Sequence, residues 1–391
     1  MADVIVVGAG PVGFLTALGL ARSGIGVTIL EAEPGINNSP RAAVYFPTTL
    51  ALLDRLGLLD DADAIGLRST RFAMRFLASG EVIPADLADT MPPGTPYAYN
   101  LHFGQHELAA LVLRHLERLP NTQVLWNHEV VAVAQDDRGG IVEATTPQGS
   151  KTFRGDWLVG ADGARSGVRR LLGLPFEGFT WPERFVATNV EYDFARRGFM
   201  EANMIVDPVD WAVCARLGRG PLWRVTYGED AQLDEATVGD RIDAHYQGIF
   251  PGITGYRIDR FSPYRVHERC APTFRVGRAL LAGDAAHVCN PCGGLGLTSG
   301  VIDADVLARA LTAVIEGRAG EDLLDFYARD RRRVFTEITS PGASNFKRQL
   351  GEPDPARRAE DRDRFLAGVQ GSEKVRGVAL AGHILGEPLP I

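Results

Sequence analysis

The hydrophobic pattern at the start of the chain predicts a strand, a helix and a second strand in close succession. Val4 to Val7 is a β-branched run with a glycine directly after it, which is typical of a strand buried on both faces. Residues 11–23 have helical composition, the Gly24-Ile25-Gly26 turn ends that helix, and residues 27–31 form the next apolar run. These elements predict a βαβ unit of the usual length, roughly 30 residues.

After this unit the chain switches between helical and alternating patterns. We expect helices at 49–59 and 105–119, with short β runs and a Pro-Pro-Gly turn between them. Strands of a hairpin-rich insertion are expected at 124–133 and 141–153.

A block of strong alternation begins after Pro175 and predicts an antiparallel sheet. Its four expected strands are 185–192, 211–217, 222–227 and 256–267. The chain then returns to a short strand at 279–283 and a helix from about 296 to 315, and it is mainly helical from residue 320.

Composition and charge narrow the class of protein. The 391 residues are 45% hydrophobic and 23% charged, which is ordinary for a soluble globular protein. The net charge of −8 and the lack of a basic cluster argue against nucleic-acid binding, which needs a cationic face. No apolar stretch is long enough to span a membrane, and no signal peptide is recognisable at the start, so we expect a cytoplasmic protein.

The four cysteines do not predict a disulfide framework in a chain of this length. Cys289 and Cys292 have the spacing of a redox motif, but they do not follow the first strand of a small domain. A zinc site would require a second pair, so no metal site is expected. We interpret the two cysteines as small residues in a loop, and the alternative is a reactive thiol near a cofactor.

Three glycines after the first strand carry the strongest local signal. Gly8 permits a tight turn, Gly10 allows the backbone to approach a pyrophosphate, and Gly13 allows the helix to pack on the strand. Glu31 ends the second strand 18 residues beyond Gly13, where a carboxylate accepts ribose hydroxyls. The motif predicts a bound dinucleotide but does not distinguish NAD from FAD.

Two later segments favour FAD over NAD. Asp162-Gly163 and Gly283-Asp284 both follow expected strands, and the second runs through Pro291 into a glycine-rich start of a helix. With the first glycines they resemble the motifs of the single-component (group A) FAD-dependent aromatic monooxygenases, which have a para-hydroxybenzoate hydroxylase-like fold. The resemblance covers the chain to about residue 340. In Leu297-Thr298-Ser299-Gly300 the chain departs from relatives that carry asparagine, which leaves the detailed shape around the flavin open.

The resemblance implies an α/β fold, in which a Rossmann-like FAD-binding domain of glutathione-reductase type is interrupted by an antiparallel β-sheet substrate domain and followed by a helical C-terminal region. The FAD-binding domain is expected at 1–70, 101–175 and 276–340, with the substrate domain at 71–100 and 176–275 and the helical region at 341–391.

The resemblance also implies a set of FAD contacts. Arg41 and Gln105 would contact the ribityl region, Val130 the adenine, Asp162 the pyrophosphate side and Asp284 a ribityl hydroxyl. Arg41 could instead be a solvated loop residue, and Gln105 could simply cap its helix. The complete expected set is Gly8, Gly10, Pro11, Val12, Gly13, Glu31, Arg41, Gln105, Val130, Asp162, Asp284, Pro291, Gly294, Leu295, Gly296 and Leu297.

Catalytic residues are harder to predict, because alternation along a strand does not say which residues face the ligand. His102, Tyr192, Arg216 and Tyr227 are candidates, and Arg224 lies on one of the same predicted strands. Each has a structural interpretation as well, so no catalytic base is assigned. The aromatic residues Trp211, Trp223 and Phe185 could line a pocket or fill the core.

The function implied by the resemblance is hydroxylation of an aromatic or heteroaromatic, phenolic small molecule by NADPH or NADH and O2, through a flavin C4a-hydroperoxide. The NAD(P)H would dock transiently, because the chain has no second glycine fingerprint. The alternatives are a natural-product tailoring enzyme acting as an epoxidase or reductase, and a flavin redox sensor without turnover. A homodimer is compatible with this assignment.

Overall fold

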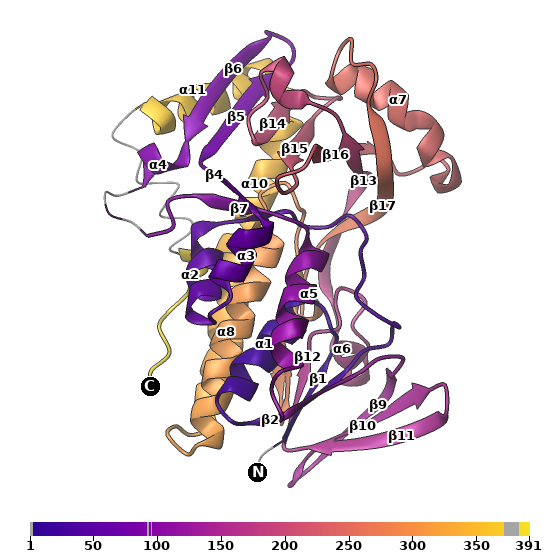
Figure 1. Ribbon diagram of the computed structural model, residues 1–391, viewed down its shortest axis with the longest axis vertical. Helices are drawn as coiled ribbons and strands as arrows, with labels where there is room; N and C mark the ends of the chain where they lie inside the picture. The colour runs from indigo at the N-terminus through magenta and orange to yellow at the C-terminus, as the bar shows by residue number, and fades with distance from the viewer. Residues whose placement is uncertain (1–2, 92–93, 95, 371–382) are drawn as a thin grey trace.

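A computed structural model describes residues 3–91, 94, 96–370 and 383–391, and Figure 1 shows how their elements are arranged. The βαβ unit predicted from the first residues is present. It consists of β1 (Asp3–Val7), α1 (Pro11–Arg22) and β2 (Gly26–Leu30), with β1 and β2 parallel. Val4 to Val7 are almost fully buried, because both faces of this strand are covered.

This unit forms the centre of a six-stranded sheet. Its order is β18-β19-β12-β1-β2-β8. The added strands are β8 (Thr122–Leu125), β12 (Trp157–Gly160), β18 (Arg275–Val276) and β19 (Ala279–Leu281). All pairs are parallel except β18 with β19. The sequence therefore contributes to this sheet from three separate segments.

Helices and a small sheet cover the six-stranded sheet. The helices α1, α5 (Gln105–Leu116) and α8 (Leu295–Ile315) pack together in front of it in Figure 1. A three-stranded sheet of β9 (Glu129–Asp136), β10 (Gly139–Thr146) and β11 (Gly149–Gly155) also packs on it, and a Cβ on Gly155 would lie 3.0 Å from Ile5. These layers make the α/β architecture that the sequence predicts.

The predicted antiparallel sheet has eight strands in the order β20-β17-β13-β16-β15-β14-β5-β6. Their bounds are β5 (Arg71–Phe76), β6 (Glu81–Asp86), β13 (Glu177–Glu191), β14 (Ala202–Val206), β15 (Ala212–Arg216), β16 (Leu222–Asp230), β17 (Arg257–Cys270) and β20 (His287–Val288). All pairs are antiparallel except β14 with β5. The long strand β17 pairs with β20, which directly follows the Gly283-Asp284 turn, and so links the two large sheets.

The eight-stranded sheet has two different faces. On one face, Val225 and Tyr227 pack under α7 (Val238–Ile249). On the other, Phe185 and Trp211 pack with Leu350 at the end of α10 (Ser340–Leu350). The register thus divides the aromatic residues of the sheet between two separate clusters.

The remaining described elements are short or peripheral. A third sheet joins β3 (Val44–Tyr45), β7 (Asn100–His102) and β4 (Leu67–Ser69). The other helices are α2 (Pro47–Arg55), α3 (Leu59–Ile65), α4 (Leu87–Thr90), α6 (Gly167–Leu171), α9 (Asp322–Val334) and α11 (Pro355–Gln370), with a π-helical turn at Phe335–Thr339. No helix in the described part of the chain is long and apolar enough to cross a membrane.

Three predicted elements are divided in the structure. The strand expected at 124–133 is β8 and β9, which belong to different sheets, and the other two elements are divided at a glycine. The single helix expected at 49–59 is two helices, because Gly57 between them adopts a φ of +53°. The strand expected at 141–153 is the hairpin β10–β11, which turns at Gly149 with a φ of +108°. In both cases one glycine in a left-handed conformation reverses or interrupts the chain.

A buried ionic group in the eight-stranded sheet leads to a stability prediction. Glu229 and Arg184 are both less than 5% exposed, with Arg184 Nη2 2.7 Å from Glu229 Oε1, and Arg241 donates to the same carboxylate. Glu229→Ala leaves the buried guanidinium of Arg184 with only one carboxylate among the described residues, the exposed one of Glu235, 3.5 Å away, so we expect the free energy of unfolding to fall by about 3–5 kcal/mol. Urea unfolding followed by tryptophan fluorescence measures this.

The control for this variant is Asp136→Ala, which removes the exposed ion pair with Arg154. It is expected to cost less than about 1 kcal/mol. Equal losses in the two variants would contradict the interpretation of Glu229 as a buried charge centre.

Candidate functional site

Three turns meet at one edge of the six-stranded sheet. The adjacent strands β1, β12 and β19 end at Val7, Gly160 and Leu281, and the carboxyl ends of parallel strands share one edge. A Cβ on Gly8 would lie 2.4 Å from the carbonyl oxygen of Ala161. The three glycine-containing segments singled out in the sequence are therefore brought together by the sheet order.

The first turn has the shape needed to hold a pyrophosphate. Gly8 has a φ of +108°, and a Cβ on Gly13 would lie 2.0 Å from the carbonyl oxygen of Gly8. By contrast, a Cβ on Gly10 would meet no atom within 4 Å, so the space above Gly10 is open. Gly10 is the N-cap of α1, with Pro11 in its first turn, and the free N–H groups at this helix end favour an anion.

Glu31 is aimed at this turn from the end of β2. Its Oε2 accepts from the backbone N–H of Ala9 at 2.7 Å, and its Oε1 accepts from that of Glu33 at 2.9 Å. An ionised carboxylate can accept about four hydrogen bonds, so capacity for ribose hydroxyls remains. The carboxylate is therefore held in place beside the glycine turn before any ligand is bound.

The second turn is held by its own aspartate and by an arginine. Asp162 accepts from Ser166 Oγ at 2.5 Å and from the N–H of Val168 at 3.0 Å, and it thereby orders the start of α6. Arg169 is buried and donates to the carbonyls of Ala164 and Ala285 at 2.9 and 2.8 Å. Since Ala285 belongs to the third turn, Arg169 ties the second and third turns together.

The third turn presents Asp284. Gly283 has a φ of +58°, and a Cβ on it would lie 2.8 Å from Val12, so this turn packs directly on the first. The Asp284 carboxylate makes no hydrogen bond among the described residues, and the residue is exposed. The surrounding protein raises the pKa of this carboxyl by removing water, while His287 and Arg41 lower it.

A loop and the start of α8 complete this side of the site. Gly294, with a φ of +66°, is the N-cap of α8, and its N–H donates to the carbonyl of Pro291 at 3.0 Å. Leu295, Gly296 and Leu297 form the first turn of the helix, whose N–H groups are free for a ligand. Glu268 holds the loop from β17, because its Oε1 accepts from both nitrogens of Asn290, at 2.9 and 2.6 Å.

Arg41 and Gln105 lie side by side at the open edge. The backbone N–H of Gln105 donates to the carbonyl of Ala42 at 3.1 Å, so the Arg41 loop and the start of α5 are in contact. The guanidinium of Arg41 lies 5.6 Å from the ring centroid of Tyr264. Val130 is half-buried on β9, beside α6, where its carbonyl would lie 3.7 Å from a Cβ on Gly167.

These features fit FAD. A pyrophosphate has open space at Gly10, ribose hydroxyls have a fixed acceptor in Glu31, and a further polyol chain has an unpartnered acceptor in Asp284. The two ends are joined by the direct packing of the first turn on the third. The cofactor would thus extend from the βαβ unit to the start of α8.

The catalytic candidates on the sheet face away from this set. Tyr227 and Tyr192 belong to the cluster under α7, with the Tyr227 ring 4.5 Å from that of His245. Arg216 donates to the carbonyls of Gly220 and Arg219 in the turn that follows β15. Arg224, which alternates with Trp223 and Tyr227 along β16, donates to the carbonyl of Arg41 and so reaches the cofactor side.

His102 lies between the two regions and is fully buried. Its Nδ1 is 3.1 Å from the carbonyl oxygen of Arg216, and its Nε2 has no partner among the described residues. Burial lowers the pKa of His102 to about 4, so the ring is neutral at pH 7. A neutral ring donating to a carbonyl is a structural link between β7 and β15.

Sequence reasoning did not single out Asn189, Tyr264 or Tyr45. Asn189 Oδ1 accepts from Arg224 Nε at 2.7 Å, because the two residues are directly paired across β13 and β16. Tyr45 is fully buried, its hydroxyl has no partner among the residues that the structure describes, and its ring stacks on Phe103 at 4.2 Å. Only the register of the sheet and the docking of the Arg41 loop bring these residues together, so no local signal in the sequence could have found them.

Cys289 and Cys292 flank the loop that Glu268 anchors. Both are free thiols, Cys289 half-buried and Cys292 buried among Phe185 and Trp211. Burial raises the pKa of both thiols, so they stay protonated and are weak nucleophiles. In the described residues no group of three or more His, Cys, Asp or Glu is arranged to hold a metal ion.

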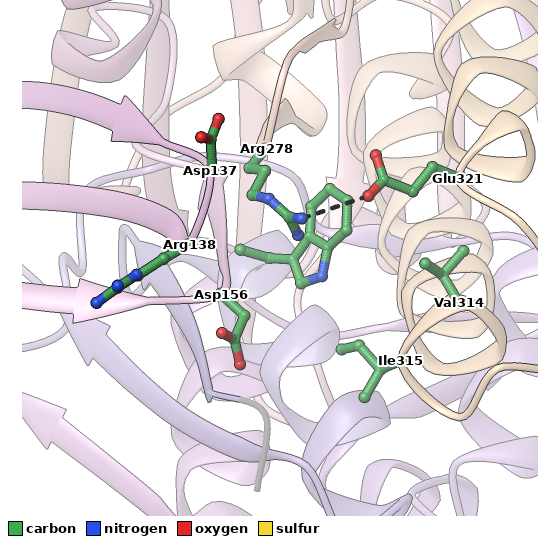
Figure 2. A pocket seen from close by; sticks show the side chains of 8 residues that line it. Asp137, Arg138, Asp156, Arg278, Val314, Ile315 and Glu321 are labelled. Atoms are coloured by element: carbon green, nitrogen blue, oxygen red, sulfur yellow. Dashed lines mark ion pairs between the residues drawn. The ribbon is translucent and has the colours of Figure 1, made fainter.

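A cavity of about 510 Å³ lies elsewhere, near the start of β12 rather than its end. Figure 2 shows its lining residues, with Arg278 paired to Glu321 at 3.5 Å and Asp137 and Arg138 on the β9–β10 turn. None of the three glycine turns contributes to it. This cavity is therefore separate from the dinucleotide site.

The different surroundings of Gly10 and Gly13 give a paired prediction. Gly13→Ala forces its methyl onto the carbonyl of Gly8, so both the apoprotein's melting temperature and FAD affinity should fall. Gly10→Ala places a methyl in open space, so the apoprotein should melt within about 2 °C of wild type while FAD affinity falls at least about tenfold. Thermal melts of apoprotein and fluorescence titration with FAD measure the two quantities. Unchanged FAD binding in Gly10→Ala would show that the pyrophosphate does not lie there.

The low pKa of His102 predicts a pH effect on stability. The unfolded chain binds this proton at about pH 6.5 and the folded chain only at about pH 4, so stability from the neutral ring is present above pH 6.5 and is lost as the pH falls toward 4. We expect His102→Gln to reduce the slope of unfolding free energy against pH in this interval. Urea unfolding at several pH values measures it, with the exposed His106 changed to Gln as the control. An unchanged slope in His102→Gln would contradict a neutral buried ring.

Comparison with known proteins agrees with this geometry. The family model described as FAD binding domain matches residues 1–341. The chain is 49% identical to the para-nitrophenol 4-monooxygenase of Pseudomonas sp. (strain WBC-3) over 361 residues, which cover 92% of this chain and 89% of that protein. It is 44% identical to the 6-hydroxy-3-succinoylpyridine 3-monooxygenase of Pseudomonas putida, over 92% of this chain and 91% of that protein.

Among solved structures, p-nitrophenol 4-monooxygenase from Pseudomonas putida DLL-E4 superposes with a TM-score of 0.94 at 45% identity, covering 99% of this chain and 100% of that one. Aklavinone-11 hydroxylase, solved with FAD and aklavinone, superposes with a TM-score of 0.80 at 28% identity, covering 91% and 70%. These matches confirm the fold, the cofactor and the enzyme class predicted from the sequence. The chain belongs to the FAD binding domain family and is a single-component, FAD-dependent aromatic monooxygenase with a para-hydroxybenzoate hydroxylase-like fold.

Proposed function

We propose that this enzyme uses NAD(P)H and O2 to hydroxylate a small phenol or hydroxypyridine, which it binds as the anion. Two similar proteins are named for acting on para-nitrophenol and on a 6-hydroxypyridine derivative, both of which are ring hydroxyl compounds. These names favour hydroxylation over the epoxidase, reductase and redox-sensor alternatives. The proposal that the substrate binds as an anion rests on one observation, the buried positive charge of Arg224.

Arg224 is a buried cation without a carboxylate partner in the described part of the chain. It is 7% exposed, and its recorded acceptors are the neutral oxygens of Asn189 and of the Arg41 backbone. Burial, together with the charges of Arg41 and Arg260, lowers the pKa of Arg224 to about 10, so it remains charged at pH 7. A buried positive charge of this kind favours a negatively charged ligand beside it.

The surrounding side chains fit an aromatic ring. Tyr264 lies within reach of both Arg41 and Arg224, and its ring is 6.2 Å from that of Phe185. Trp211 packs on Phe185 at 4.9 Å, in the cluster on the same face of the sheet. These residues offer apolar faces to a ring while Arg224 offers a charge to its hydroxyl.

In this proposal FAD, when bound, supplies electron transfer and oxygen activation. The chain's own residues bind and orient the ring, and Arg224 lowers the pKa of the substrate hydroxyl because it stabilises the anion. A deprotonated ring oxygen makes the ring more electron-rich, which favours attack on an electrophilic oxygen. No side chain of the protein then needs to act as the base in the hydroxylation step itself.

Where FAD binds, we propose the contacts inferred from the sequence. Asp284 would accept from a ribityl hydroxyl, Arg41 and Gln105 would contact the ribityl region, and Val130 the adenine. Support comes from the open carboxylate of Asp284 and from the contact between the Arg41 loop and α5. Asp162 would act through the turn that it orders.

We further propose that the enzyme works in the cytoplasm, because its reductant NAD(P)H is an intracellular compound. A homodimer stays a prediction from the sequence. Size-exclusion chromatography with light scattering would test it, and a single mass near 42.3 kDa would show a monomer instead.

The role of Arg224 is tested with para-nitrophenol as the probe, since its anion has its own visible absorption. Wild-type holoenzyme should bind it as the anion at a pH about one unit below the pKa of the free phenol. Arg224→Met should bind it mainly protonated and about tenfold or more weakly, because a charge-assisted contact is lost. Arg224→Lys should restore part of the anion signal.

Arg216→Met is the matched control, because Arg216 is held by carbonyls of the turn after β15. This variant should leave binding within about twofold of wild type. Anion binding by Arg224→Met equal to wild type would overturn the assignment. Absorption spectra across pH, together with NADPH consumption and product analysis, separate loss of binding from loss of hydroxylation.

A further inference from the structure

A fully buried carboxylate lies directly behind the Gly283-Asp284 turn. Asp303, on α8, is 0% exposed and accepts three hydrogen bonds. Its Oδ2 accepts from the N–H of Gly283 at 3.0 Å and from His287 Nε2 at 2.6 Å, and its Oδ1 accepts from Arg331 Nε at 2.8 Å. The Asp303 side chain thus binds to residues at both ends of the turn that contains Asp284.

Arg331, the third donor, carries this contact further from the site. Its guanidinium is fully buried and donates Nη1 to the carbonyls of Ile384 and Leu385 at 2.9 and 3.2 Å, and Nη2 to Ser299 Oγ at 3.3 Å. A buried guanidinium needs acceptors for all its N–H groups. The segment 383–391 supplies two of these acceptors, the carbonyls of Ile384 and Leu385.

The segment 383–391 is docked by side chains as well. Ile384 is 2% exposed and belongs to the hydrophobic core of the FAD-binding domain. The N–H of Glu387 donates to Asp330 Oδ2 at 3.1 Å, and Gly386 adopts a φ of +76° where it passes the same carboxylate. Docking here is therefore specific and includes both apolar and polar contacts.

The histidine in this network packs against two aromatic rings. The ring of His287 stacks on Phe335 at 4.3 Å with an interplanar angle of 24°, and the ring of Phe274 lies 5.6 Å away. Phe335 is the first residue of the π-helical turn, and such turns often occur at functional sites. The ring nitrogen toward Asp303 must donate, because a carboxylate oxygen only accepts.

We propose that Asp303 is a positioning residue for Asp284, and that the C-terminal segment 383–391 is a structural part of the flavin half of the FAD site. The chain of contacts runs from Ile384 and Leu385 through Arg331 and Asp303 to the N–H of Gly283. Undocking the segment leaves Arg331 with fewer acceptors and loosens its hold on Asp303. The turn that carries Asp284 then loses its fixed geometry, and the flavin half of the cofactor loses its acceptor.

This inference rests on the proposed contact between Asp284 and a flavin-side hydroxyl, and it does not depend on which substrate is hydroxylated. The proposal predicts different effects on FAD binding and on ADP binding, which a general loss of stability would not produce. The glycine turn after β1 and Glu31 bind the ADP half of FAD, and Asp303 contacts neither. A substitution of Asp303 should therefore weaken FAD binding but not ADP binding.

The experiment is calorimetric titration of apoprotein with FAD and, separately, with ADP. Asp303→Asn should weaken FAD about tenfold, because charge-assisted hydrogen bonds are lost, and leave ADP within about twofold. Asp305→Asn is the matched control: it makes the same change two residues along α8, where the carboxylate pairs with Arg55 instead. It should leave both affinities unchanged.

A second pair of variants tests the C-terminal segment and remains informative if Asp303→Asn does not fold. Ile384→Asp places a charge in the core and should undock the segment, weakening FAD at least about threefold with ADP unchanged. Leu385→Asp makes a similar change at a side chain that is 47% exposed and should have no effect. Far-UV circular dichroism of each apoprotein checks folding.

Equal weakening of FAD and ADP would overturn the proposal, because it would show a general structural role. Unchanged FAD affinity in Ile384→Asp would overturn the part concerning the C-terminal segment. Neither measurement uses a substrate, so failure here is distinguishable from failure of the proposed hydroxylation.

Discussion

The structure depends on the direct contact of three backbone turns at the end of the six-stranded sheet. Gly8 lies against Ala161, and Gly283 and Gly300 lie against Val12, at distances where a Cβ on any of these glycines would collide. Main-chain atoms therefore replace side chains at the centre of the site. This close approach brings the anion-binding end of α1 and the start of α8 to the same edge of the sheet, where an extended dinucleotide could reach both.

The rest of the fold supports this contact from two directions. Arg169 and Asp303 hold the second and third turns with buried charged groups. Such groups stabilise the fold only when they are fully hydrogen-bonded and paired. From the side, β17 pairs with β20 and carries Glu268, which fixes the loop before α8. The eight-stranded sheet is consequently not an independent attachment, since its strand β17 also shapes the cofactor site.

Charge is distributed unevenly around the site. Asp284 and Glu31 face the places where hydroxyl groups of the cofactor are expected, whereas Arg41 and Arg224 gather at the face of the eight-stranded sheet. In the proposed function, a hydroxyl-rich cofactor and an anionic ring would therefore bind at different places. Because Arg224 is buried, its charge would affect the pKa of a bound phenol more than a charge at the surface would.

The sequence by itself determined the cofactor and the enzyme class. Gly8, Gly13 and Gly283 are required by local backbone geometry and close contact, so their spacing identifies a dinucleotide turn without knowledge of the rest of the chain. Alternation also predicted an antiparallel sheet correctly, since side chains two residues apart share a face.

Only the tertiary structure decided which side of that sheet faces the Arg41 loop. The pattern of β16 is the same whether Trp223 and Tyr227 or Arg224 faces the cofactor, and a shift of one residue exchanges the two faces. The pairing of Asn189 with Arg224 and the docking of the Arg41 loop resolve this choice in favour of Arg224. The contact between Arg331 and residues 384–385 joins positions more than 50 residues apart, and no local preference in the sequence encodes such a contact.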